Sequence, residues 1–311
     1  MDKPLYPGET YTLSWERAEV AFYNAAPGEK DATSWIRFQY AGTNLDSLSF
    51  GHEVLRPYLK IMPTPSYGEQ IQYRTAHGRL DFAPPLDKTY HEALFGTPLN
   101  VIAGGAGEAK LRPEKASATA VLVYAVRSPY PVVDGEWTGT FRAGKDDSIK
   151  VAIAYADWRT RDYTVDQVLP AQPQWKSVWE SKGGGPHKMS LKAADLGLRG
   201  EYQYLVKLEL TAAADAKQVG VDELKFSNVL QQSQLALPRL LPGKNIINVS
   251  SGSMRPGYQL RVCYVWDDAK GKDRKAEKMI ERAPFTFEIE AAGTAPKDVR
   301  TKTLTLEAVK K

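Results

Sequence analysis

The chain has 311 residues, more than one ordinary hydrophobic core accommodates, so two or three domains are expected. A hydrophobic content of 42% with 25% charged residues excludes an intrinsically disordered chain. Its 41 basic and 37 acidic residues are scattered and leave a net charge of +4, which argues against a nucleic-acid-binding protein. No apolar run reaches the roughly 20 residues that a membrane span requires.

The start of the chain and its single cysteine bear on the compartment. Residues 1–8 lack the basic and apolar regions of a signal peptide, yet they stand directly before a predicted strand. Of two explanations, an intracellular protein or a chain whose signal or upstream domain has been trimmed away, we favour the second. We therefore expect a secreted or periplasmic protein. Cys263 has no partner for an intrachain disulfide.

Residues 1–130 predict an N-terminal β-rich domain. Apolar side chains alternate over residues 10–22 and again over residues 118–126, which indicates strands with one buried face. Between them, residues 52–99 are punctuated by prolines, which cannot donate to a sheet and therefore indicate loops and edge strands. The proline-rich turn that follows predicts a domain boundary near Ser128–Val133.

Residues 134–235 predict a β-sandwich, and its strongest strand covers residues 202–210. In this strand Tyr204, Val206 and Leu208 fall on one face, whereas polar residues mark the other face. Alternation with a period of two indicates a sheet with one buried and one wet face. We therefore expect these three side chains to be buried.

Residues 236–311 predict further strands, either a small third sandwich or the completion of a neighbouring one. Alternation over residues 258–266 indicates a strand, and the charged residues 267–282 indicate a solvated hairpin arm or a short helix. The boundary with the middle domain is expected near Gln232–Pro238. Short strands at roughly ten-residue spacing predict an all-β chain of tandem antiparallel β-sandwich domains, jelly-roll or immunoglobulin-like, with less than about one-tenth helix.

One aromatic and charged segment is the candidate binding site. It follows a predicted core strand and sets Trp158 and Tyr163 among Arg159 and Arg161. Loops at the edge of a sandwich commonly carry function. An aromatic ring offers a flat apolar surface to a sugar, and a guanidinium group offers forked donors to hydroxyls or a uronate carboxylate. We predict a weak glycan site at these four residues; the alternative is that the two rings belong to the core.

Two further tryptophans, Trp175 and Trp179, fall on one face if they share a strand. Exposed on a sheet, such rings could stack on sugars. We expect them instead to be core residues of the sandwich, because large aromatic side chains dominate such cores.

An enzyme with its site in the N-terminal region is the alternative function. A polysaccharide lyase needs an Arg or His to neutralise a uronate and a Tyr or His to take the proton, and such residues occur around His52, His77 and His91. No spacing singles them out, and no metal-binding His-Glu-x-x-His motif is present. Loop or rim histidines explain the same pattern, and a glycoside hydrolase in this region is equally open.

No cofactor is predicted. The glycine-rich residues 104–107 lack the following Lys-Ser/Thr of a phosphate-binding loop. A structural calcium ion could take oxygens from acidic residues of the predicted turns, although solvated turns explain them as well. These residues are Asp134, Asp146, Asp147, Asp222 and Glu223.

Several motifs of the middle domain carry a family resemblance. They are Asp134-Gly135-Glu136-Trp137, Trp175 with Trp179, Gly184-Gly185-Pro186-His187, Tyr202–Leu210 and Leu237–Asn245. Residues 134–250 resemble a galactose-binding-like β-sandwich accessory domain found in bacterial secreted proteins that handle polysaccharides. The resemblance implies a jelly-roll fold and a non-catalytic role next to a catalytic domain or a protein encoded nearby.

We therefore expect a non-catalytic, carbohydrate-associated accessory or binding module. Its expected partner is a polysaccharide or another glycan, with no nucleic acid and no membrane span. A purely structural spacer domain is the third interpretation, and the sequence does not separate it from the first.

Overall fold

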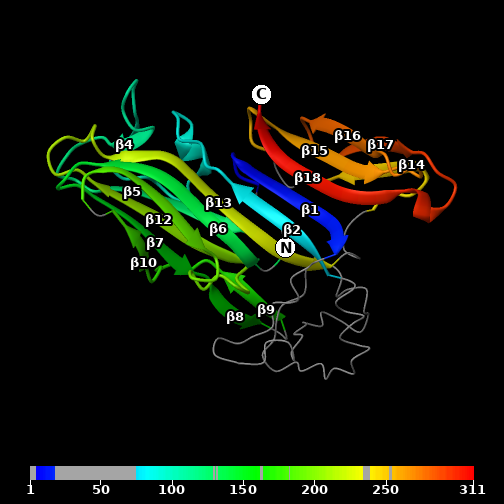
Figure 1. Cartoon of the computed structure of the whole chain (residues 1–311), viewed down its shortest axis with the longest axis horizontal. Helices are drawn as coiled ribbons and strands as arrows, with labels where there is room; N and C mark the ends of the chain where they lie inside the picture. Colours follow the sequence, from blue (N-terminus) through cyan, green and yellow to red (C-terminus); the bar gives the residue numbers. More distant parts are fainter. Residues whose placement is uncertain are drawn as a thin grey trace. The chain divides into compact units, whose positions relative to one another are not determined.

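The computed structural model describes residues 5–17, 75–128, 130, 132–161, 164–181, 183–233, 239–251 and 254–311. The chain divides into two compact units. Unit 1 consists of residues 1–8 and 81–229, and unit 2 of residues 9–80 and 230–311. Apart from two short 3-10 helices, the regular structure of the described residues consists of strands (Figure 1). The predicted all-β sandwich class is therefore confirmed.

Unit 1 is a sandwich of two sheets. The first has the order β11-β6-β13, with β4 also pairing with β13 and β3 with β4; the second has the order β10-β7-β12-β5. The elements are β3 (Val101–Ala103), β4 (Leu111–Pro113), β5 (Ala120–Arg127), β6 (Val132–Ala143), β7 (Ser148–Tyr155), β10 (Lys176–Glu180), β11 (Gly185–Lys192), β12 (Gln203–Thr211), β13 (Gly220–Ser233) and the 3-10 helix η3 (Tyr90–Ala93). A separate hairpin pairs β8 (Asp157–Arg161) with β9 (Thr164–Val168).

The core of unit 1 lies between its two sheets and is rich in aromatic rings. Trp137 of β6 stacks on Tyr204 of β12 at 5.4 Å between ring centroids, and it meets Phe226 of β13 edge-on at 5.2 Å. All three side chains are fully buried. Offset-stacked and edge-to-face pairs are the arrangements that the ring quadrupole favours, so these contacts add to the burial of apolar surface.

The predicted burial of β12 is confirmed. Tyr204, Val206 and Leu208 are all 0% exposed, as the alternation of their strand predicts. Leu205, on the opposite face, is buried as well, because it packs with Ala125 and other apolar side chains in a small cluster on the outer side of this sheet. The expected wet face of β12 is therefore partly covered.

The division into units does not coincide with the boundary expected near Ser128–Val133. β5, which precedes this turn, pairs with β12 along its length, so residues on both sides of the turn share one sheet. The turn itself is held within unit 1, since the Ser128 amide donates to the Tyr202 carbonyl at 2.8 Å and the Val132 amide donates to the Glu201 carbonyl at 2.9 Å. Proline-rich turns connect strands within a sandwich as readily as they separate domains.

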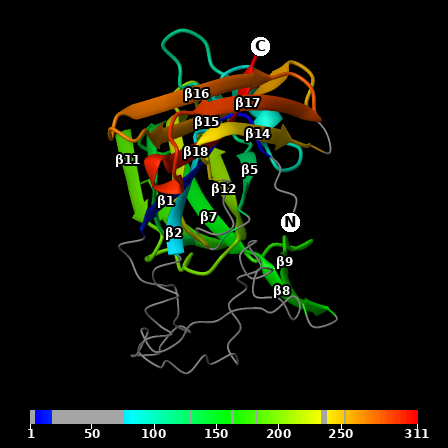
Figure 2. The ribbon, with the colours of Figure 1, turned by 90° about the vertical axis from the view of Figure 1, so that its right-hand side faces the viewer.

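Unit 2 contains a sheet of order β1-β18-β15-β16 and a two-stranded sheet of β14 and β17 (Figure 2). Its strands are β1 (Glu9–Arg17), β14 (Gly243–Val249), β15 (Tyr258–Asp267), β16 (Asp273–Ile280), β17 (Phe285–Ala291) and β18 (Arg300–Lys310); the 3-10 helix η5 covers Pro296–Asp298. β2 (Thr75–Phe82) and β13 contribute residues to both units. The charged segment after β15 returns as β16, so the expected hairpin arm is present and the short helix is not.

The core of unit 2 follows the predicted alternation of β15. Val262, Tyr264 and Trp266 are buried on one face, and Tyr264 pairs with Leu304 of β18. Cys263 lies on the opposite, charged face and is itself mostly buried, and this burial raises the pKa of its thiol. Among the described residues there is no helix long and apolar enough to cross a membrane.

Candidate functional site

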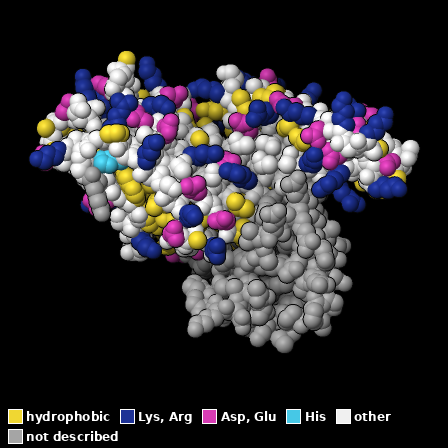
Figure 3. Space-filling model, viewed as in Figure 1, with side chains coloured by type: hydrophobic (Ala, Val, Ile, Leu, Met, Phe, Trp, Pro, Cys, Tyr) yellow, Lys and Arg dark blue, Asp and Glu magenta, His cyan; other side chains and the backbone are white. Residues whose placement is uncertain are grey.

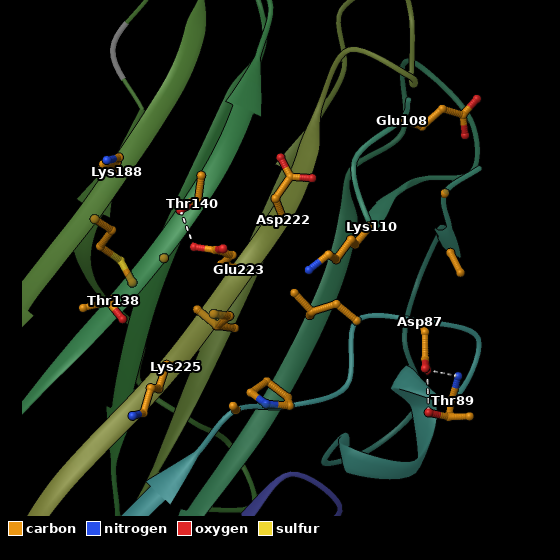
Figure 4. Close-up of a pocket in the computed structure, with 18 of the residues that line it drawn as sticks. Asp87, Thr89, Glu108, Lys110, Thr138, Thr140, Lys188, Asp222, Glu223 and Lys225 are labelled. Atoms are coloured by element: carbon orange, nitrogen blue, oxygen red, sulfur yellow. Dashed lines mark hydrogen bonds between the residues drawn. The ribbon is translucent and has the colours of Figure 1, made fainter. Parts of the chain in front are cut away.

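An open groove of about 1260 Å³ lies on the outer face of the first sheet of unit 1 (Figure 4). Its floor is formed by neighbouring strands β11, β6 and β13, and its sides by the loop that follows β2 and by the loop between β3 and β4. Polar lining residues are Asp87, Lys88, Thr89, Glu108, Lys110, Thr138, Thr140, Lys188, Ser190, Asp222, Glu223 and Lys225. All of these residues belong to unit 1.

Strand alternation explains why the groove floor is polar. In β6, Trp137 and Phe141 point into the core, so Thr138 and Thr140 point outward. The register of β11 with β6 sets Lys188 opposite Thr140 and Ser190 opposite Thr138. Hydroxyl and ammonium groups from two strands therefore stand side by side on the outer face.

The two carboxylates on the floor are held by neighbouring donors. The Thr140 hydroxyl donates to Glu223 Oε2 at 3.0 Å, which joins β6 to β13. Arg142 binds Asp222 with both arms, from Nε at 2.5 Å and from Nη2 at 2.9 Å, and its Nη1 donates to the Gly107 carbonyl at 2.9 Å. Asp222 raises the pKa of the Arg142 guanidinium, because the bidentate hydrogen bond and the attraction both favour the charged form.

The loop between β3 and β4 is held together by Glu108. Its Oε2 accepts a hydrogen bond from the Gly105 amide at 2.9 Å and from Arg112 Nε at 2.7 Å. These hydrogen bonds lower the pKa of Glu108 to about 2. A side chain at Gly104 would place its Cβ 1.9 Å from the Ala109 carbonyl oxygen, so the loop requires glycine there. The Gly104 and Gly105 amides donate to Lys110 and Glu108 within the loop.

Three of the four groove lysines form no ion pair within the part of the chain that the structure describes. Lys225 lies 3.5 Å from Asp81, whereas Lys88, Lys110 and Lys188 form no ion pair with any residue that the structure describes. Figure 4 shows the Lys110 ammonium group directed toward Glu223 and Asp222, with Lys188 beyond Thr140. The groove therefore combines two carboxylates that are paired with cations, Asp222 and Glu108, with three lysines that form no ion pair with a described residue.

Charges elsewhere on the surface are mixed. On the face of the molecule in Figure 3, basic and acidic side chains are interspersed over the described residues. The groove therefore does not differ from the rest of this face by an excess of one charge. It differs in which of its charged side chains form ion pairs.

The site predicted from the sequence falls on the β8–β9 hairpin. The structure replaces the expected loop with a strand, because Trp158 pairs with Gln167 and Arg159 with Asp166 in a regular antiparallel register. Arg161 is the last residue of β8. The side chains of Trp158, Arg159 and Arg161, and the whole of Tyr163, lie outside the described residues, so the glycan site predicted here stays a prediction.

Trp175 and Trp179 do not share a face. Trp179 stacks on Phe141 at 4.9 Å between ring centroids, inside the sandwich. Trp175 packs on the small outer cluster that contains Leu205, with the Lys207 ammonium 4.9 Å above its ring. The register of β10 shifts between Ser177 and Trp179, and such a bulge inserts one residue and reverses the alternation. From the sequence, both tryptophans are expected in the core of the sandwich. Only Trp179 lies between the sheets, where it is half-buried.

The histidines of the alternative enzyme site are only partly described. His91 lies in η3, is exposed, and contacts the Tyr90 ring edge-on. The Tyr90 hydroxyl donates to the Val101 carbonyl at 3.0 Å, and burial raises its pKa, so this tyrosine is engaged in the fold. His52 and the side chain of His77 lie outside the described residues.

Three of the five calcium candidates already have partners within the protein. Asp147 accepts hydrogen bonds from the Gly144 and Ala213 amides at 2.6 and 2.8 Å. Asp222 and Glu223 are engaged by Arg142 and Thr140 as described above. In the part of the chain that the structure describes, no three His, Cys, Asp or Glu residues are grouped so that they could hold a metal ion.

Comparisons with known proteins give structural neighbours only. No protein-family model matches the chain. No curated protein matches it. Among solved structures, tailspike protein 4 of bacteriophage CBA120 aligns with 45% of this chain and 18% of its own, at 11% identity and a TM-score of 0.22. The tandem CBM22-1–CBM22-2 domains of Paenibacillus barcinonensis Xyn10C align with 69% of this chain and 86% of their own, at 11% identity and a TM-score of 0.22.

A third neighbour is the FMN-binding β-glucuronidase of Facaelibacterium prausnitzii L2-6. It aligns with 65% of this chain and 28% of its own, at 12% identity and a TM-score of 0.19. At such identities and scores none of the three carries an argument about this chain.

The sequence does not predict the groove. Of its polar residues, only Asp222 and Glu223 are candidates from the sequence, as ligands of a structural calcium ion. The outward positions of Thr138 and Thr140 follow from the alternation of β6, but nothing in the sequence says that Lys188 of β11 stands beside them. To predict the groove from the sequence, one would need to know that β11 pairs with β6, because this pairing sets Lys188 beside Thr140.

Proposed function

We propose that this chain is a non-catalytic glycan-binding accessory module and that the groove across β11, β6 and β13 is its binding surface. The observation that carries the proposal is the run of hydroxyl, carboxylate and ammonium groups on neighbouring strands. Lys188, Thr140 and Glu223 form one such row, joined at its centre by the Thr140–Glu223 hydrogen bond.

A glycan matches this surface because every sugar hydroxyl both donates and accepts hydrogen bonds. Threonine and serine hydroxyls can serve either role, carboxylates accept and ammonium groups donate. Leu86, which is half-buried, lines the same groove and offers apolar surface to the C–H face of a sugar ring. From β11 to β4 the groove crosses three strand spacings, about 14 Å, which exceeds the width of one pyranose ring.

Binding is favoured over hydrolysis by the state of the carboxylates. A glycoside hydrolase needs a carboxylic acid that keeps its proton near neutral pH, opposite a second carboxylate. In the groove, Asp222 is occupied by Arg142, and the pKa of Glu108 is lowered to about 2 by its hydrogen bonds. Neither suits a general acid. The lyase or hydrolase alternative keeps its expected place around His52, His77 and His91.

The proposal includes a secreted or periplasmic setting and a catalytic partner, on the same polypeptide or encoded nearby. An accessory module of this kind would hold the partner close to its polymer, which raises the effective concentration of substrate. A structural spacer would lack this effect.

The test is to block the groove without disturbing the core. Thr138 points outward from the centre of β6, and a strand surface tolerates an aromatic residue, so Thr138→Trp fills the floor of the groove. Lys192→Trp is the matched control, on the outer face of β11 beyond the groove lining. On an array of neutral and acidic glycans, we expect the native chain and the control to bind and the Thr138→Trp variant to lose most of its binding.

Two results would overturn the proposal. One is a native chain that retains no glycan of the array. The other is a folded Thr138→Trp variant whose binding equals that of the native chain, because the bound surface would then lie elsewhere.

A further inference from the structure

We infer that the groove selects glycans with repeated acidic groups, uronate or sulfate, and that Lys110 and Lys188 bind two of these groups at opposite ends. The inference rests on the proposed function and narrows it to one class of ligand.

The four carboxylates that line the groove all have partners within the protein. Asp222 is bound by Arg142, and Glu108 by Arg112 and by Lys217 at 3.4 Å. Glu223 accepts from the Thr140 hydroxyl, and Asp87 accepts from the amide and hydroxyl of Thr89. For an acidic ligand, the charges of Asp222 and Glu108 are therefore compensated by neighbouring cations, and Glu223 and Asp87 face the four groove lysines. Like charges brought together without such compensation would repel it.

Three lysines of the groove carry charges that no ion pair within the described part of the chain engages. Lys88, Lys110 and Lys188 are exposed lining residues, and none forms an ion pair with a described residue. A lysine ammonium is a compact charge with three donors, which suits a carboxylate or sulfate group that has lost little of its hydration. In a neutral glycan these three charges would have no counterpart.

Two of these lysines stand at opposite ends of the groove. Lys188 stands on β11, opposite Thr140 of β6, and Lys110 immediately precedes β4, whose Leu111 pairs with Val221 of β13. The order β11-β6-β13-β4 separates the two lysine positions by about three strand spacings, roughly 14 Å. One acidic monosaccharide cannot reach both ends.

Between the two lysines lie polar groups that suit the uncharged part of a glycan. Thr140 and Glu223 occupy the middle of the row, where Figure 4 shows them between Lys188 and Lys110. A hydroxyl and a carboxylate suit the neutral hydroxyls of a sugar and not its acidic group. The order of charged, polar and charged positions therefore fits a polymer in which acidic groups recur along the chain.

The expected effects are modest for each lysine, because exposed ion pairs are screened by water and salt. We expect Lys110→Gln and Lys188→Gln each to weaken binding of an acidic oligosaccharide by about two- to five-fold, and the double variant by about ten-fold. The affinity of the native chain should fall as the salt concentration rises, since the charges lie at the surface.

The experiment measures affinities by calorimetry on the full chain. The probes are an oligogalacturonate and a chondroitin sulfate oligosaccharide as acidic ligands, and a xylo-oligosaccharide and a cello-oligosaccharide of similar length as neutral ones. The control for Lys110→Gln/Lys188→Gln is Lys176→Gln/Lys192→Gln. It removes the same charge from exposed lysines that do not line the groove.

The inference is supported if an acidic probe binds more tightly than both neutral ones and only the groove double variant loses that preference. It is overturned, with the proposed function intact, if neutral probes bind equally well and the groove lysines have no effect. Equal losses in both double variants would also overturn it, because attraction would then depend on net charge alone. If no probe and no array glycan binds the native chain, the proposed function fails as well.

Discussion

Tyr204 of β12 donates its hydroxyl hydrogen to Oδ1 of Asn228 of β13 at 2.8 Å, and both side chains are fully buried. Because the two strands belong to different sheets, this bond joins the two halves of the sandwich through its core. It also pairs an asparagine that would otherwise be costly to bury. The groove residues Asp222, Glu223 and Lys225 lie earlier in β13, so the bond helps to hold the strand that supports the candidate site.

Removing the Tyr204 hydroxyl should therefore destabilise unit 1. We expect Tyr204→Phe to lower the free energy of unfolding by about 1–2 kcal/mol, the cost of a lost buried hydrogen bond. The measurement is denaturant unfolding followed by fluorescence. Thr119→Val, which removes the exposed bond between Thr119 and Thr211, is the control and should cost only a few tenths of a kcal/mol. Equal effects of the two substitutions would contradict the structural role of the Tyr204–Asn228 bond.

A charge in the core tests the burial of β12 directly. Val206 is 0% exposed, so Val206→Asp places a carboxylate where it finds neither water nor a partner, at a cost of several kcal/mol. We expect unit 1 to unfold or to lose most of its stability, as measured by thermal unfolding. Gln203→Asp, on the opposite and partly exposed face of the same strand, should leave the melting temperature almost unchanged. A folded Val206→Asp variant with native stability would show that the face is wrongly assigned.

The Glu108 loop should respond to acid at an unusually low pH. In the folded state the pKa of Glu108 is lowered from 4.5 to about 2, chiefly by the Gly105 amide and Arg112. A lowered pKa means that the carboxylate stabilises the folded loop at pH values above 4.5 and that this contribution disappears as the pH falls toward 2. The chemical shift of the Gly105 amide, followed by NMR, should have its midpoint near pH 2. The inflection should vanish in Glu108→Gln, and a midpoint near pH 4.5 in the native chain would refute the arrangement.

The β8–β9 hairpin offers a second surface that calorimetry can test. If Trp158 stacks on a sugar, Trp158→Ala should weaken glycan binding by about 1–2 kcal/mol, roughly ten-fold. The probe is any glycan retained by the native chain on the array. An unchanged affinity in a folded variant would remove the hairpin site and leave the groove as the remaining candidate. Additive losses in Trp158→Ala and Thr138→Trp would instead indicate two separate surfaces.

The sequence by itself determines which faces of several strands are buried. The alternation of Tyr204, Val206 and Leu208 predicts which face of β12 is buried, because successive side chains of a strand point to opposite faces. The same rule predicts that Val262 and Tyr264 are buried. These features depend only on residues that are neighbours along the chain, so a single sequence determines them.

The candidate site depends on pairings that only the tertiary structure decides. Thr140 and Glu223 are 83 residues apart in sequence, and Arg142 and Asp222 are 80 residues apart, yet each pair is in hydrogen-bond contact. Strand alternation says which side chains face outward, but it does not say which strands are neighbours or in what register. A bulge in β10 likewise separates Trp175 from Trp179, although their spacing predicts one face. The faces of the strands are thus local properties of the sequence, whereas the groove arises from long-range strand pairing.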